Sequence, residues 1–196
     1  DRSVSRGLGD VYKRQVVVYC SSQAGLPEEV TDGARLIAAK IGECGATLVY
    51  GGVNAGLMHT VAQTAHNAGA CVVGVVPEIF RHRADAVCDE LVLTSDLNER
   101  KSRMIEMGDV FVVLPGGIGT IDEWISTLSD IMVRERADKE ADRPILVWNH
   151  QGMYDGTVAQ LSATTASVYA RGGRIDRSLV FASAQDLALQ LAKSLA

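Results

Sequence analysis

Apolar residues follow two alternating patterns from Val16 onward. Short runs, such as residues 16–20 and 109–114, are apolar at nearly every position, which is typical of strands buried on both faces. The segments between them repeat apolar residues every three or four positions, which predicts amphipathic helices. The pattern therefore predicts a chain that alternates strand and helix.

The predicted elements define a fold class. Strands are expected at 16–20, 47–50, 71–76, 90–94, 109–114, 144–148 and 179–181, and helices through 30–41, at 55–67, at 97–107, after 119, within 154–169 and at 184–195. After 119, the helix is expected to bury one face, formed by Ile121, Trp124, Ile125, Leu128, Ile131 and Met132. Repeated strand–helix units predict a single domain over 16–196, a doubly wound, Rossmann-like α/β fold with helices on both faces of a parallel sheet. In such sheets, ligands bind beyond the carboxyl ends of the strands, near the switch point of strand order.

Residues 1–15 differ from the rest of the chain. They are polar and basic and show no clear period. We interpret them as a non-native leader, and a short disordered native arm is the alternative.

The amino-acid composition limits the kinds of partner that we expect the protein to bind. The 196 residues carry a net charge of −5 and are 47% hydrophobic and 5% aromatic, so nothing indicates a nucleic-acid partner. No apolar segment is long enough to suggest a membrane partner, and we expect no signal peptide. The four cysteines are far apart, which predicts reduced thiols in a cytoplasmic protein and no metal site.

Three glycine- or serine-containing turns follow predicted strands, at 20–25, 51–56 and 115–120. Their candidate binding residues are Ser21, Ser22, Gly51, Gly52, Gly116, Gly117, Gly119 and Thr120. Glycines there can adopt positive φ and leave amides uncovered at helix N-termini, which suits a phosphate. Tight packing of strand against helix is the alternative for any one turn. Neither the lysine-containing triphosphate loop nor Gly-x-Gly-x-x-Gly is present, so a single phosphate, as in a nucleoside monophosphate, fits best.

Charged residues flank the third turn. Arg100, Lys101 and Arg103 cluster where a helix is expected to begin, a place that the helix dipole disfavours for cations, so a phosphate or Glu123 could hold them. The alternative is a solvated basic face. Glu123 follows Thr120 at the spacing of a capping box, in which the glutamate binds the backbone at the helix start. A site carboxylate that binds ribose hydroxyls is the other interpretation.

Three segments resemble a known family. "PGGIGTIDE" (115–123), "ERKSRM" (99–104) and "YGGVNAGLM" (50–58) are similar to motifs of the Lonely Guy proteins, cytokinin-activating phosphoribohydrolases. The resemblance implies hydrolysis of the N-glycosidic bond of a nucleoside 5′-monophosphate, with no metal or organic cofactor. It implies that Arg100 and Glu123 are catalytic and that Gly116, Gly117, Gly119 and Thr120 hold the phosphate. Lys101 and Met104 would contact substrate, and a homodimer is expected.

The chain departs from the family pattern at three positions. Val53 replaces a third glycine, His59 replaces the glycine of "GLMG", and Leu97 replaces a frequent methionine. These differences leave the base preference open. The older family label of lysine decarboxylase finds no support, because nothing marks a pyridoxal-phosphate lysine with its supporting acid.

Two other functions remain open from sequence. One is a non-catalytic nucleotide or cofactor carrier, which would not need the Arg100/Glu123 pair. The other is a general AMP or purine monophosphate nucleosidase without a hormone role, which would use the same catalytic centre.

Overall fold

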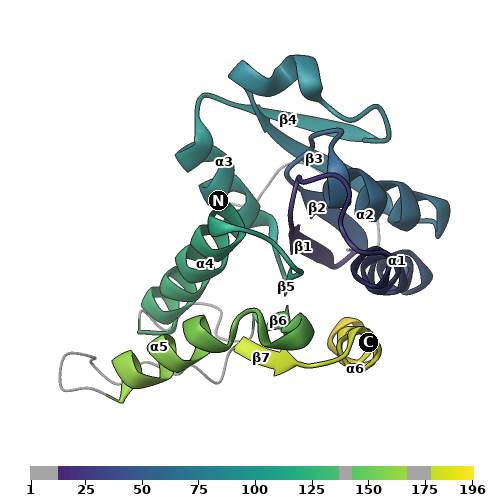
Figure 1. The fold of residues 1–196 in the computed structure, drawn as a ribbon. Coiled ribbons are helices and arrows are strands. Elements are labelled where there is room, and N and C mark those ends of the chain that lie inside the picture. Colours follow the sequence, from purple (N-terminus) through teal and green to yellow (C-terminus); the bar gives the residue numbers. More distant parts are fainter. Residues whose placement is uncertain (1–12, 137–142, 167–177) are drawn as a thin grey trace.

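The computed structural model describes residues 13–136, 143–166 and 178–196, drawn as a ribbon in Figure 1. The strands are β1 (Gln15–Tyr19), β2 (Thr47–Tyr50), β3 (Cys71–Pro77), β4 (Glu90–Thr94), β5 (Val110–Val113), β6 (Ile145–Trp148) and β7 (Ser178–Phe181). The helices are α1 (Glu28–Glu43), α2 (Gly56–Asn67), α3 (Leu97–Met107), α4 (Ile118–Arg136), α5 (Asp155–Thr165) and α6 (Ala184–Leu195), with short 3₁₀ helices η1 (Glu78–Arg83) and η2 (His150–Gly152).

The strands form one parallel sheet in the order β4-β3-β2-β1-β5-β6-β7. β1 lies at the centre, where Val16 pairs with Leu48 of β2 on one side and with Val110 of β5 on the other. The chain therefore builds outward from β1 to β4 and then returns to β5, which makes the carboxyl ends of β1 and β5 the topological switch point. The predicted doubly wound fold is confirmed.

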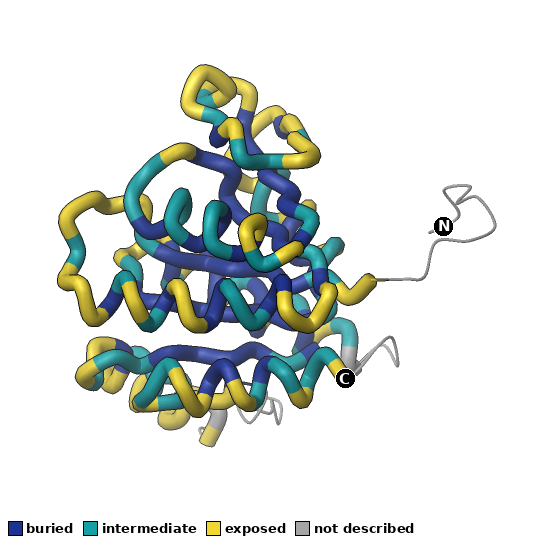
Figure 2. Tube along the Cα trace, turned by 90° about the vertical axis from the view of Figure 1, so that its right-hand side faces the viewer, coloured by how far each residue is buried: buried dark blue, intermediate teal, exposed yellow. Residues whose placement is uncertain are grey.

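Each face of the sheet is covered by a layer of helices (Figure 1). One core cluster joins α1, α2 and α6 to Val16 and Val18 of β1. The other joins α3, α4 and α5 to Val17 and Tyr19, the alternate residues of the same strand. Burial on both faces explains why the strands read as continuous apolar runs, and the buried sheet is seen between exposed helix surfaces in Figure 2. Among the described residues, no helix has the length and apolar character that crossing a membrane requires.

Some element bounds differ from the expected ones. β1 begins at Gln15, so the last residue of the expected leader lies in the sheet, where its amide donates to Asp109 Oδ2 at 2.8 Å. Residues 1–12 lie outside the described residues, as do 167–169, the end of the segment expected to contain α5. Ile125 was expected on the buried face of α4 but is 40% exposed, whereas Trp124, Leu128 and Ile131 are buried.

The packing between α1 and β6 can be tested at Gly33, a glycine within α1. A Cβ on Gly33 of α1 would lie 2.1 Å from Cη2 of the buried Trp148 ring. We expect Gly33→Ala to lower the free energy of unfolding by about 1–3 kcal/mol, because the rigid ring must shift. Gly156 of α5 has open space around the corresponding position, so Gly156→Ala should instead stabilise by about 0.4–1 kcal/mol. Urea unfolding of both variants measures the difference, and equal effects would contradict the packing.

Candidate functional site

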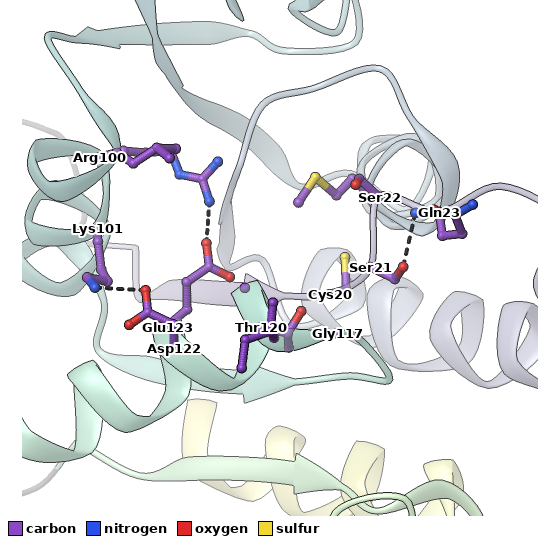
Figure 3. Close-up of a pocket in the computed structure, with 14 residues that line it drawn as sticks. Cys20, Ser21, Ser22, Gln23, Arg100, Lys101, Gly117, Thr120, Asp122 and Glu123 are labelled. Carbon is purple, nitrogen blue, oxygen red and sulfur yellow. Dashed lines mark hydrogen bonds and ion pairs between the residues drawn. The ribbon is translucent and has the colours of Figure 1, made fainter.

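A cavity of about 440 Å³ opens at the switch point (Figure 3). The loop after β1 forms one wall, with Cys20, Ser21, Ser22 and Gln23, and Met58 of α2 adds to the lining. The facing wall comes from the first turns of α3 and α4. Its residues are Leu97, Arg100, Lys101, Gly117, Ile118, Gly119, Thr120, Asp122 and Glu123.

The N-terminus of α4 supplies free amides to this cavity. Its first intrahelical bond runs from Ile121 N to Gly117 O at 3.1 Å, so the amides of Ile118, Gly119 and Thr120 precede the helical ladder. The space next to the α-carbons of Gly117 and Gly119 is open, which leaves the turn uncovered. Backbone donors at the positive end of a helix dipole form an anion site.

Among the three glycines of this turn, Gly116, Gly117 and Gly119, only Gly116 is needed for room. None of them is among the positive-φ glycines of the described chain. A Cβ on Gly116 would lie 2.1 Å from Thr120 Oγ1, so a side chain there would displace the threonine. Gly116 therefore lies behind Thr120 and is absent from the cavity lining. It contributes by letting Thr120 pack against the turn.

Arg100 and Glu123 face each other across the gap between α3 and α4, and Arg100 Nη2 donates to Glu123 Oε1 (Figure 3). Their side chains are 14% and 8% exposed. The capping-box interpretation of Glu123 is wrong, because α4 begins at Ile118, Thr120 is already inside the helix, and the Glu123 carboxylate binds Arg100. The interpretation of Arg100 as part of a solvated basic face is wrong for the same reason.

Burial raises the pKa of the Glu123 carboxyl above its ordinary value of 4.5, and the Arg100 guanidinium opposes that rise. We expect a ¹³C-carboxyl titration of glutamate-labelled protein to give Glu123 a midpoint above 4.5. The resonance is assigned as the one absent from Glu123→Gln. As the pH falls through the raised pKa the charged form is lost, so activity that needs the carboxylate should decline above the usual glutamate range. A midpoint at or below 4.5 would show that Arg100 dominates over burial.

A side-chain cap similar to a capping box lies at the start of α3, next to the cavity. Asp96 Oδ1 accepts from the amides of Asn98 and Glu99 at 2.8 Å each, and Glu99 Oε2 accepts from Ser95 N at 2.7 Å. The bonds fix the first turn of α3, from which Arg100 projects. The spacing Asp96-x-x-Glu99 in the sequence could have revealed this cap.

The loop after β1 is tied to the glycine turn. Ser21 N donates to Pro115 O at 3.1 Å, and Ser21 Oγ accepts from Gln23 N at 3.0 Å. These bonds hold the serines beside the N-terminus of α4, at the distance that the parallel pairing of β1 with β5 sets. Two of the three predicted turns therefore meet at one cavity.

The second predicted turn lies behind the cavity. Gly51 borders Arg100, since a Cβ there would lie 3.5 Å from Arg100 Nη1. Gly52 has φ +68° and packs against Val76, so tight packing explains it. Met104 is buried in the core cluster of α3, α4 and α5. Gly51, Gly52 and Met104 are absent from the cavity lining, as Gly116 is, and their contact with substrate stays a prediction.

Several lining residues were missed from sequence: Cys20, Gln23, Met58, Leu97, Ile118 and Asp122. Cys20 and Gln23 flank the predicted serines, so the strand-end rule could have included them. The exposed apolar side chains of Leu97 and Ile118 carry no pattern that marks a site. Within the described ranges, no group of three or more His, Cys, Asp or Glu side chains is arranged to hold a metal ion.

The fold and the site together define a class: a doubly wound α/β protein in which a glycine turn and a helix N-terminus open to the cavity beside a buried arginine–carboxylate pair. A family model described as "Possible lysine decarboxylase" matches residues 58–191. A cytokinin riboside 5′-monophosphate phosphoribohydrolase of Mycobacterium tuberculosis is 34% identical over 173 residues, which cover 87% of this chain and 89% of that protein. A probable enzyme of the same name from Oryza sativa subsp. japonica is 34% identical over 74% of this chain and 64% of its own length. The chain therefore belongs to this family, the Lonely Guy family.

Solved structures share the fold. The molybdenum cofactor binding protein from Rippkaea orientalis has a TM-score of 0.71 and 20% identity, over 94% of this chain and 98% of that one. The molybdenum cofactor carrier protein from Chlamydomonas reinhardtii has a TM-score of 0.71 and 21% identity, over 94% and 99%. At this identity the likeness concerns the fold alone.

Proposed function

We propose that this protein hydrolyses the N-glycosidic bond of a nucleoside 5′-monophosphate, giving free base and ribose 5-phosphate. The buried Arg100–Glu123 pair carries the proposal, because it lies in the same cavity as the free amides of α4. A phosphate on the amides leaves the ribose facing the carboxylate. The names of the curated relatives support the same reaction.

Backbone amides, rather than cationic side chains, hold the phosphate. The charges of Arg100 and Lys101 are matched in the cavity by Glu123 and Asp122, each in an ion pair. Uncompensated positive potential comes from the helix end, at the amides of residues 118–120. Ser21, Ser22 and Thr120 line the same cavity, and their hydroxyls would add neutral donors.

Glu123 acts on the sugar. As the C1′–N bond breaks, its electron pair leaves with the base and the ribose ring becomes oxocarbenium-like. The Glu123 carboxylate binds ribose hydroxyls and stabilises that positive charge, and it orients the water whose oxygen bonds to C1′. The water supplies the proton that the departing base takes up. Arg100 holds the carboxylate in place and stabilises the departing base.

The base lies toward the apolar part of the lining, formed by Met58, Leu97 and Ile118. Apolar side chains contact a purine without forming hydrogen bonds to its polar edge, and they favour a base that carries an apolar substituent. A cytokinin nucleotide, with its apolar side chain, is therefore the preferred substrate in this proposal, and AMP is a poorer one.

A chromatographic assay of free base tests the proposal. The substrates are AMP, isopentenyladenosine monophosphate and other nucleoside monophosphates, with adenosine as the control that lacks phosphate. We expect base from the monophosphates only. A protein that binds these nucleotides and releases no base would instead be a carrier, and equal turnover of adenosine would contradict the phosphate site.

A homodimer in the cytoplasm stays a prediction. Ile125 and Val133 of α4 are 40% and 60% exposed, and such apolar side chains suit a contact between copies. Analytical ultracentrifugation measures the oligomeric state, and a monomer at micromolar concentration would contradict it.

A further inference from the structure

A second ion pair joins α3 to α4 next to Arg100–Glu123. Lys101 Nζ lies 2.8 Å from Asp122 Oδ2, and Figure 3 shows the two pairs side by side. Each helix contributes two consecutive residues, 100 and 101 from α3 and 122 and 123 from α4. Consecutive residues on a helix project in different directions, so the pairs constrain both the separation and the rotation of the two first turns.

Lys101 is engaged by Asp122 rather than free to bind an anion. Its side chain is 22% exposed, and that of Asp122 is 60% exposed. Asp122 Oδ1 also accepts from Ser126 Oγ at 3.5 Å on the next turn of α4. A phosphate reaching the Lys101 ammonium would meet the Asp122 carboxylate beside it, which repels it.

We propose that Lys101 and Asp122 are positioning residues that hold the first turn of α3 against the first turn of α4. This inference rests on the proposed function. When ribose hydroxyls bind Glu123, they compete with Arg100 for the same carboxylate. While ribose hydroxyls replace Arg100 as partners of Glu123, the Lys101–Asp122 pair keeps the two helix starts in the same relative position. Arg100 and Glu123 therefore stay aligned in the transition state. Misalignment by a fraction of an ångström lowers the rate without weakening phosphate binding.

Charge reversal tests the pair, because only partners that act on each other are restored by exchange. We expect Lys101→Asp and Asp122→Lys each to lower kcat about tenfold, with the KM for AMP changed less than about threefold. The double variant should recover kcat to within about threefold of the wild type. A phosphate-binding lysine gives another pattern: Lys101→Asp raises KM, Asp122→Lys does not, and the exchange restores nothing. That pattern would overturn the proposal.

Two further measurements complete the test. Asp32 and Arg35 form an exposed pair within α1, outside the cavity lining, so their exchange is the matched control and should leave kcat within about twofold of the wild type. Thermal unfolding of the same variants reports the pairing without any catalysis. If the wild type releases no base, the proposed function is contradicted. The pairing of Lys101 with Asp122 is still supported in that case if the double variant has a higher Tm than both single variants. The proposal would be refuted if the double variant had a Tm as low as that of the less stable single variant and recovered no kcat.

Discussion

Glu123→Gln is expected to lower kcat for base release by about 10²–10⁴-fold, the range that a positioned acid–base or electrostatic group contributes. The amide keeps the size of the side chain and an oxygen that can accept from Arg100. It loses the negative charge that stabilises the oxocarbenium-like ribose. The KM for AMP should change little, because the phosphate binds on α4 and not on this side chain.

Glu106→Gln is the matched control for this substitution. Glu106 lies on α3, outside the cavity lining, and pairs only with Arg103 among the ion pairs of the described residues. Its kcat should stay within about twofold of the wild type. Circular dichroism and thermal unfolding establish that Glu123→Gln remains folded. Full turnover by a folded Glu123→Gln would remove the carboxylate from the mechanism.

Ile118→Pro is expected to lower kcat/KM for AMP by about 10–100-fold, the equivalent of one hydrogen bond to a charged group. Residue 118 is the first of α4, a position where proline fits the helix and removes one amide donor. Because the lost donor would bind phosphate, the effect should appear in KM more than in kcat.

Ile118→Ala separates the amide from the side chain. Ile118 is 83% exposed, so its truncation should not disturb the fold and keeps the backbone donor. If the alanine variant keeps its affinity for ribose 5-phosphate, which has no base for the Ile118 side chain to contact, while the proline variant loses it, the amide is responsible. Equal losses in both variants would show that the apolar side chain, and not the amide, sets the affinity.

The fold could be predicted from the sequence because both faces of the sheet are covered. Residues 47–50 of the buried β2 were predicted with the bounds that the structure has, and so were helix 184–195 and the mostly exposed edge strand 90–94. Strands buried on two sides appear in the sequence as continuous apolar runs, and the ends of a run indicate the ends of the strand. The prediction failed at Ile125 of α4, because helical spacing alone does not determine whether solvent or core lies opposite a side chain.

The site could be predicted in part. The rule that ligands bind at the carboxyl ends of strands placed Ser21 and Gly117 at one cavity, and the structure brings them together. Local pattern could not decide the partner of Glu123, because a capping box and a bond to Arg100 demand the same residue at the same position. That choice depends on how α3 lies against α4. Met104 shows the converse limit, since Arg100 and Lys101, one turn earlier on α3, line the cavity while the Met104 side chain faces the core.

The most direct test of the account is a crystal structure of Glu123→Gln with AMP bound. The account predicts the phosphate within hydrogen-bond distance of the amides of residues 118–120, and the ribose hydroxyls against the side chain at position 123. A phosphate bound elsewhere, such as on the exposed arginines of η1, or a ribose turned away from α4, would contradict it.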